Sequence, residues 1–302
     1  MKQILPSLLS LCTLLALTTQ AAQVDPSQTP GSALDQAMRI KRSPTEQALN
    51  EDGGNLNELK RSGKNFNYHF GLFSDIEYQS NANLDGNGGK GAAVWLPAAE
   101  AGLTWKFAPQ WSLSSTASAD AGLYTDVDEQ NYWGLNLRNE IKYSLGSNLP
   151  HFYAGPDFYR YQSLDTGDEI SLAFAPKVGV GYGYLMDRSK TYLFSDVRYQ
   201  HHFVNSPIDT SRDTVRVMLG LTQQLTESWF AQAYYEYRFS DYDDLLGRED
   251  SRNTVGLSLI WEATRNLSLR LNTNFIDNDS NDPNASFQTF NTGLGSALIW
   301  RY

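Results

Sequence analysis

The sequence ends in FQTFNTGLGSALIWRY, Phe287 to Tyr302, a stretch in which two kinds of residue alternate. Steps of two back from the C-terminus give a largely apolar set: Tyr302, Trp300, Leu298, Ser296, Leu294, Thr292 and Phe290. The interleaved set is mostly small or polar: Arg301, Ile299, Ala297, Gly295, Gly293, Asn291 and Thr289. Since neighbouring side chains of a strand point to opposite faces, the pattern predicts a β-strand with one apolar face.

The fold to which this strand belongs depends on its aromatic end. A soluble β-sandwich also alternates in this way and is the alternative fold. With Trp300 and Tyr302 at the terminus, however, the stretch resembles the closing strand of Gram-negative outer-membrane β-barrels, whose terminal aromatic residue is an assembly signature. The resemblance implies a transmembrane barrel in contact with outer-membrane lipid, lipopolysaccharide and the barrel-assembly machinery.

The composition agrees with a membrane barrel. The 302 residues include 17 Tyr, 14 Phe and 7 Trp, although the mean hydropathy of −0.45 is that of a polar chain. A transmembrane barrel has this composition because only every second residue of a strand faces lipid. The formal net charge of −10 argues against nucleic acid as a partner, since binding it requires neutralising phosphates.

Residues 1–21 have the features of a secretory signal peptide. An apolar core from Leu8 to Leu17 precedes Thr19-Gln20-Ala21, which fits a cleavage site. The only cysteine of the chain is Cys12, and Leu11 before it is too large for a lipoprotein signature. Cleavage would therefore leave a mature chain without disulfides or thiolate metal ligands.

Residues 22–64 form a polar segment rich in Pro, Ser, Thr and Asn, with a basic run at 39–42. We expect a mostly irregular N-terminal extension. It is either a mobile periplasmic tail or a peptide that enters the barrel lumen or binds a periplasmic partner, because its basic run is attracted to acidic groups.

From residue 65 to residue 302 the alternation continues, and the predicted fold class is all-β: a transmembrane antiparallel up-and-down β-barrel. About twelve strands are expected, at 65–80, 93–107, 111–125, 131–145, 151–164, 169–186, 191–205, 212–226, 228–240, 252–263, 266–277 and 287–302. Strands of about 10 residues or more can cross a bilayer when tilted. In 151–164 two alternating sets compete and no facing is predicted, and Pro156 and Pro176 are expected to cause bulges because proline cannot donate to a ladder.

The connections alternate in length as well. Tight turns, such as 108–110, 187–190, 226–227 and 263–265, alternate with longer acidic loops at 81–92, 126–130, 164–168, 205–211, 241–251 and 277–286. Outer-membrane barrels have short periplasmic turns and longer extracellular loops. Aromatic residues beside the short turns predict a girdle at the periplasmic rim: Trp105, Phe107, Trp111, Tyr143, Tyr184, Trp229, Trp261, Trp300 and Tyr302.

The opposite face of the strands predicts the character of the interior. The candidate pore-lining residues are Glu77, Glu100, Arg138, Lys142, Asp196, Arg198, Arg216, Glu236, Arg238 and Arg270. Because buried charges must be paired or hydrated, and acids and bases are nearly balanced, we expect a mutually paired lining around either a passage or a closed lumen. Inward glycines leave room for water, a plug or a solute. Four inward tyrosines are expected to cover glycines or, alternatively, to stack on sugar rings: Tyr124, Tyr132, Tyr192 and Tyr234.

Neither catalysis nor a cofactor is expected. The His-x-Ser triplet of outer-membrane phospholipases is missing from the sequence, and His202 with Asp196 is the only inward pair worth naming. A histidine beside an aspartate in a charged lining is usually an ion pair. Residues 277–281, DNDSN, have the opening spacing of a calcium loop but lack the Gly and Glu that should follow, so no metal site is predicted.

One further resemblance bears on function. Residues 70–83, FGLFSDIEYQSNAN, resemble the first strand and loop of barrels encoded with exopolysaccharide export systems, which share a Tyr-x-x-Asn-x-Asn type ending. The match covers one strand and implies a passage for oligo- or polysaccharide, in export or uptake. The alternatives are a general small-solute porin, a non-conducting structural barrel and an outer-membrane lipid-modifying enzyme.

Overall fold

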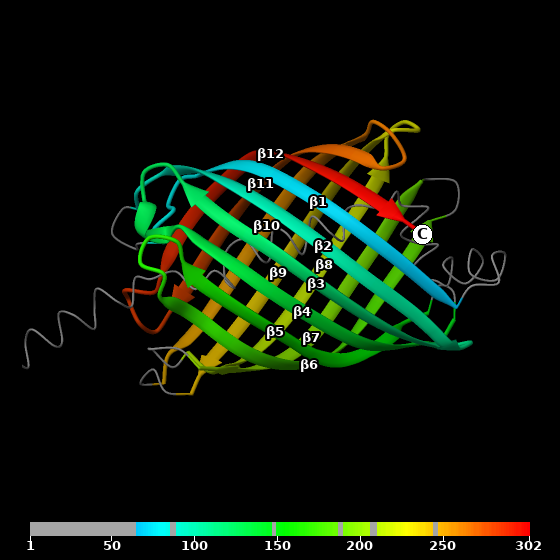
Figure 1. Cartoon of the computed structure of the whole chain (residues 1–302), viewed down its shortest axis with the longest axis horizontal. Helices are drawn as coiled ribbons and strands as arrows, with labels where there is room; N and C mark the ends of the chain where they lie inside the picture. The colour runs from blue at the N-terminus through cyan, green and yellow to red at the C-terminus, as the bar shows by residue number, and fades with distance from the viewer. Residues whose placement is uncertain (1–64, 85–88, 147–148, 187–189, 206–209, 244–246) are drawn as a thin grey trace, which may run out of the picture.

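The chain forms one closed antiparallel barrel in which each strand pairs with its neighbours in sequence (Figure 1). This computed structural model describes residues 65–84, 89–146, 149–186, 190–205, 210–243 and 247–302, so the signal peptide predicted at 1–21 and the segment 22–64 lie outside the described residues. The strands are β1 (Phe66–Gln79), β2 (Ala92–Ala108), β3 (Trp111–Tyr124), β4 (Tyr132–Ser144), β5 (His151–Ser163), β6 (Glu169–Met186), β7 (Thr191–Val204), β8 (Arg212–Gln224), β9 (Trp229–Tyr242), β10 (Glu249–Glu262), β11 (Leu267–Ser280) and β12 (Phe287–Arg301). A 3-10 turn, η2 (Asp128–Gln130), lies between β3 and β4. Among the described residues, no helix is long and apolar enough to cross a membrane.

The barrel closes between its first and last strands. Tyr68 and Tyr302 exchange backbone hydrogen bonds of 3.1 and 2.9 Å, and Leu72 lies opposite Leu298. Closure leaves no strand edge with unpaired backbone groups, which is the condition for a sheet to stand in hydrocarbon. The predicted fold class, the count of twelve strands and the closing role of the C-terminal stretch are confirmed.

Three strands on the long-loop side run further than the sequence predicted. Strand β9 continues to Tyr242, β10 begins at Glu249 and β11 continues to Ser280. The predicted loops 241–251 and 277–286 are therefore too long. These strand ends are polar on both faces, so they show no apolar alternation, yet their backbones still pair, as Asp250 does with Ser280. Residues 277–280, which have the opening spacing of a calcium loop, therefore lie within strand β11.

The two prolines do not cause the predicted bulges. Pro156 and Pro176 lie directly opposite one another in an unshifted register, and the irregularity between β5 and β6 falls at Tyr161/Gln162 instead. The backbone pairing is interrupted on the edge of each strand that faces away from the other proline: between β5 and β4 at Pro156, and between β6 and β7 at Pro176. Each proline therefore leaves a gap in the ladder where its missing N–H is needed, without adding a residue to the strand.

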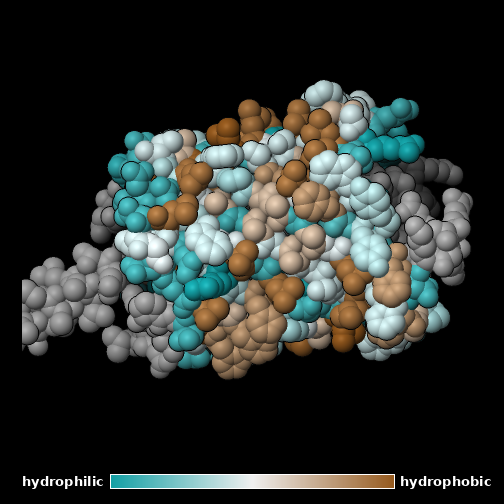
Figure 2. All heavy atoms as spheres, viewed as in Figure 1, coloured by the Kyte–Doolittle hydropathy of each residue, from teal (hydrophilic) through white to brown (hydrophobic). Residues whose placement is uncertain are grey.

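The outer surface of the barrel is apolar around its middle. Large hydrophobic side chains stand exposed along the strands, for example Ile76, Leu219 and Leu257. Figure 2 shows apolar side chains spread across the middle of one face, with the strongest hydrophilic patches towards the ends. At the short-turn rim an aromatic run passes from Trp105 to Phe107, Trp111 and Tyr143, with ring centroids 5.3, 6.4 and 4.7 Å apart. Such a surface suits a bilayer, with amphipathic rings at the headgroup level.

The facing of β5, which the sequence left open, is now defined. Tyr153, Tyr159 and Tyr161 are buried inside the barrel, whereas Phe152 and Phe158 are exposed on the outside. The inner tyrosines bond across the lumen wall: the Tyr159 hydroxyl lies 2.8 Å from Nδ1 of His202. The hydroxyl group explains why the tyrosines of β5, and not its phenylalanines, face inward: a phenylalanine on the inner face would leave the polar groups there without a partner.

Candidate lumenal site

Four arginines stand side by side on the inner wall, and we call them the arginine row: Arg198 of β7, Arg216 of β8, Arg238 of β9 and Arg252 of β10. The strand register places each one directly opposite the next. Like charges directly opposite each other across a strand pair are destabilising. The row therefore needs either counter-charges from the protein or an anion in the lumen.

One carboxylate lies within the row. Glu236 is 2% exposed, and its Oε2 lies 3.0 Å from Nε of Arg216. Nη2 of Arg238 donates to the other carboxylate oxygen of Glu236, Oε1, at 3.0 Å. Glu236 thus bridges the two central arginines, and a single negative charge is shared by two guanidinium groups.

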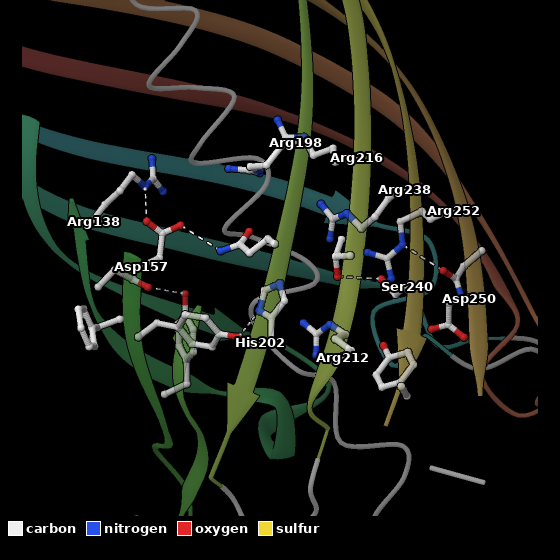
Figure 3. Close-up of a pocket in the computed structure, with 18 of the residues that line it drawn as sticks. Arg138, Asp157, Arg198, His202, Arg212, Arg216, Arg238, Ser240, Asp250 and Arg252 are labelled. Carbon is white, nitrogen blue, oxygen red and sulfur yellow. Dashed lines mark hydrogen bonds and ion pairs between the residues drawn. The ribbon is translucent and has the colours of Figure 1, made fainter. Parts of the chain in front are cut away.

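The two outer arginines of the row, Arg198 and Arg252, stand one on either side of this bridged pair. Nε of Arg252 donates to the neutral Oδ1 of Asn278 at 3.1 Å, and its guanidinium lies 5.3 Å from the ring centre of Phe287. Within the described part of the chain, Arg198 makes no hydrogen bond or ion pair. Figure 3 shows Arg198, Arg216, Arg238 and Arg252 projecting from adjacent strands towards one space.

That space is a cavity of about 120 Å³, in the half of the lumen nearer the long loops. Its described lining holds six arginines against two aspartates, because Arg138 and Arg212 join the arginine row, and Asp157 and Asp250 supply the acids. Uncharged hydroxyl and amide groups lie among them: Asn136, Tyr159, Gln200, Thr214, Ser240, Tyr242 and Asn278. The cavity combines an excess of positive charge with many hydrogen-bonding groups.

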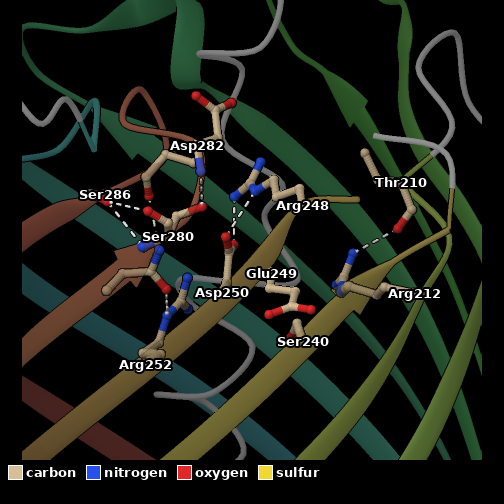
Figure 4. Close-up of polar contacts among 12 residues, drawn as sticks. Thr210, Arg212, Ser240, Arg248, Glu249, Asp250, Arg252, Ser280, Asp282 and Ser286 are labelled. Atoms are coloured by element: carbon tan, nitrogen blue, oxygen red, sulfur yellow. Dashed lines mark hydrogen bonds and ion pairs between the residues drawn. The ribbon is translucent and has the colours of Figure 1, made fainter. Parts of the chain in front are cut away.

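Asp250, the acid at the end of this cavity nearer the long loops, is paired with Arg248. Asp250 accepts two hydrogen bonds from Arg248, from Nε at 2.9 Å and from Nη2 at 2.6 Å (Figure 4). Burial lowers the pKa of the Arg248 guanidinium, but its bonds to Asp250 and nearby acidic groups outweigh burial and raise that pKa above its usual value. The guanidinium also lies 4.6 Å from the ring centre of Tyr242, whose ring Arg212 approaches to 5.5 Å. Asp250 is thus paired with an arginine that lies outside the arginine row.

Acidic side chains gather on another part of the wall, on β1, β2 and β3. Asp75 is paired with Arg270, and Glu77 accepts a hydrogen bond from Nδ2 of Asn272 at 2.8 Å. Glu100 lies 2.8 Å from Nε2 of His69. Asp120 accepts from Nδ2 of Asn136, also at 2.8 Å. The mutual pairing expected from the sequence is therefore only partial: pairs form, but the acids and the arginine row occupy different walls.

The remaining predicted residues extend from the first cavity towards the short turns. Arg138 is 3.8 Å from Asp157 and lines both this cavity and a second one nearer the short turns. Lys142 and Asp196 line only the second cavity. Sequence reasoning missed Arg212, Arg252 and Asp157. Arg212 shares its alternating set with Arg216, which is the signal that was available.

The histidine–aspartate pair considered for catalysis is not formed. Nδ1 of His202 lies 2.8 Å from the hydroxyl of Tyr159, whereas Asp196 accepts a hydrogen bond of 2.7 Å from the hydroxyl of Tyr153. The two residues follow one another along the inner face of β7 but bond to different tyrosines of β5. In the described ranges, no group of three His, Cys, Asp or Glu side chains is placed to hold a metal ion.

Comparison with known proteins identifies the fold. No protein-family model and no curated protein sequence matches the chain. Among solved structures, an outer membrane channel from Pseudomonas putida F1 is similar, with 9% identity and a TM-score of 0.53 over 78% of this chain and 95% of that one. The NanC porin (11% identity, TM-score 0.46, 75% and 98% covered) and the β domain of the Bordetella autotransporter BrkA (11%, 0.48, 78% and 100%) are also similar. The fold is that of an outer-membrane β-barrel.

Proposed function

We propose that this outer-membrane barrel is a passage for saccharides that carry negative charge. The observation behind the proposal is the arginine row, in which four guanidinium groups lie in one register and one buried carboxylate, Glu236, bridges the two central ones. An arginine guanidinium binds carboxylate, sulfate or phosphate through a planar fork of donors. An anion in the lumen would relieve the repulsion between the row's neighbours.

The neutral groups of the same cavity support a saccharide rather than a simple ion. The hydroxyls of Thr214 and Ser240 lie 3.3 Å apart within the lining, and Nε2 of Gln200 reaches Asp157 at 3.2 Å. Hydroxyl and amide groups both donate and accept, as sugar hydroxyls do. The resemblance of residues 70–83 to barrels encoded with exopolysaccharide export systems points to the same class of solute.

The test is ion conduction by the full-length protein in planar lipid bilayers. We expect anions to be preferred in a salt gradient, and addition of a hyaluronan hexasaccharide to interrupt the current. Arg198→Gln and Arg252→Gln should each weaken the anion preference and the block, because each removes a charge without breaking the Glu236 bridge. Arg160→Gln is the matched control, since Arg160 is exposed on the outer face of β5 and pairs there with Glu169 at 3.1 Å.

Three results would contradict the proposal. Equal interruption by a neutral hexasaccharide, with no effect of the two substitutions, would favour the general small-solute porin. A complete lack of conduction and of saccharide binding would favour a non-conducting barrel. Hydrolysis of outer-membrane lipid by the purified protein would favour a lipid-modifying enzyme over a passage.

A further inference from the structure

A second cavity lies in the half of the lumen nearer the short turns. Its volume is about 250 Å³, and it shares Arg138 with the cavity at the arginine row, so the two spaces meet at that side chain. A space of this size takes several water molecules or a small organic ring. Aromatic rings line both cavities, but the lining of the second holds a single arginine where the first holds six.

The aromatic rings come in two pairs on the strands beside β6. On β7, Tyr192 and Phe194 are stacked with ring centroids 6.2 Å apart and an angle of 24° between planes. On β5, His151 and Tyr153 lie with centroids 6.2 Å apart and planes at 33°. The strand between them presents glycines at the corresponding inner positions, among them Gly179 opposite Tyr153. The wall therefore consists of bare backbone flanked by rings.

The rings lie flat against the wall. A methyl group added at Gly220 would sit 2.2 Å from Cζ of Phe194 and 2.7 and 2.8 Å from its two Cε atoms. The three nearest atoms all belong to the Cζ end of the ring, so this end of Phe194 covers Gly220. Gly179 is covered by Tyr153 in the same manner, with Cζ at 2.3 Å. The Phe194 and Tyr153 rings therefore both cover glycine backbone. Tyr153 is buried, whereas Phe194 is only partly buried and lines the cavity.

Polar groups surround this surface. The hydroxyl of Tyr153 donates to Oδ2 of Asp196 at 2.7 Å, which holds the Tyr153 ring in place. Gln232 is 4% exposed, and its Nε2 donates to Thr222 at 3.2 Å. Among the described residues, Oε1 of Gln232 has no hydrogen-bond donor. A buried carbonyl oxygen without a donor is unusual, so this atom is open to a hydroxyl donor from water or from a solute.

We propose that this cavity is a subsite for an uncharged sugar ring, with Phe194 as its stacking surface and Gln232 as a hydroxyl acceptor. The inference rests on the proposed function and deepens it: the arginine row binds the acidic group, and this subsite binds the ring that carries it or follows it. The C–H groups of a pyranose face are weakly positive and match the negative face of an aromatic ring. Flat rings along a wall favour such contact, whereas rings standing on edge would not.

The test compares two ligands on full-length Phe194→Ala. With the hyaluronan hexasaccharide, the duration of each current block should fall about 2- to 13-fold, the equivalent of about 0.5–1.5 kcal/mol for one aromatic contact. With hexaglutamate, an anion without rings, the block should not change. Phe203→Ala is the matched control, because Phe203 lies on the same strand but is 53% exposed on the outer face.

The outcomes separate this inference from the proposed function. Block of the unsubstituted protein by the hexasaccharide, with no change in Phe194→Ala, would refute the ring subsite and leave the charged passage intact. An equal loss with both ligands would also refute it, since it would indicate a collapsed lumen. If the barrel does not conduct, calorimetric titration of the folded protein with the hexasaccharide decides: weaker binding by Phe194→Ala than by Phe203→Ala supports the subsite, and equal binding rejects it.

Discussion

A single buried carboxylate allows the arginine row to exist. Glu236 lies diagonally between Arg216 and Arg238 and contacts both at 3.0 Å. Without it, adjacent guanidinium groups would face each other in a wall where desolvation makes charge costly. The outer members Arg198 and Arg252 flank this bridged pair on either side. The same residue thus stabilises the barrel and limits how much positive charge the lumen offers to a solute.

At the level of this residue, Glu236→Gln should lower the free energy of unfolding by about 3–5 kcal/mol, the usual cost of removing one partner from a buried ion pair. Urea titration, followed by the heat-dependent gel mobility of folded barrels, measures it. Glu169→Gln should cost less than about 1 kcal/mol, because its pair with Arg160 is exposed. A loss of similar size in both variants would show that Glu236 is not a structural counter-ion.

At the scale of the strand, alternation separates lipid from lumen. Along β8 the outer set includes Val215, Val217, Leu219 and Leu221, whereas the inner set includes Arg212, Thr214 and Arg216. The other strands alternate in the same way between lipid-facing and lumen-facing residues. A shift of one residue in the register of a strand would move every side chain to the opposite face. The cost of a misplaced charge therefore depends on which face it is on and how deep it lies.

Two arginine substitutions on the outer face test the depth. Leu219→Arg, in the middle of β8, should destabilise the barrel by about 2–4 kcal/mol, because a charge near the bilayer midplane is poorly solvated. Leu225→Arg, beside the short turn that follows β8, should cost about 0–1 kcal/mol at the interface. The two leucines are similarly exposed, at 52% and 55%, so only depth differs. Equal costs in lipid vesicles would place β8 outside the bilayer.

At the scale of the whole molecule, closure of the barrel determines which strands face one another across the lumen. Strand β12 pairs with β1 across the longest sequence separation in the barrel, and that pairing brings acidic β1–β3 round to face a lumen shared with the arginine row of β7–β10. Charges of opposite sign on different walls create a field across the lumen. A solute with separated charged and neutral groups would be oriented by such a field.

A cysteine pair across the seam tests closure and register together. With Cys12 replaced by serine, a short bifunctional thiol reagent should cross-link Leu72→Cys to Leu298→Cys nearly completely, because directly opposed residues have Cβ atoms about 4.5–5.5 Å apart. Leu72→Cys with Leu294→Cys is the control, since Leu294 lies opposite Ile76 instead. Cross-linking of the control pair in preference to the first would mean that the seam is shifted.

The sequence alone determined where the strands lie and, in most of them, which face meets lipid. Both follow from alternation between neighbouring residues, which is a local property of a strand. Only β5 remained open, because tyrosine and phenylalanine are both apolar enough for either side. The ends of β9, β10 and β11 were misplaced for a related reason: beyond the membrane both faces are polar, and pairing there depends on backbone hydrogen bonds that no residue pattern marks.

Only the tertiary structure decided how residues on different strands are placed relative to one another. Arg198 and Arg252 are far apart in sequence, and only the register of four strands puts them in one row with Arg216 and Arg238. Register likewise laid Phe194 over Gly220, so that glycines expected to leave space are covered by rings. The near balance of acids and bases among the inward positions could not show that acids and arginines occupy different walls. These contacts join residues on different strands, so their geometry arises only when the barrel closes.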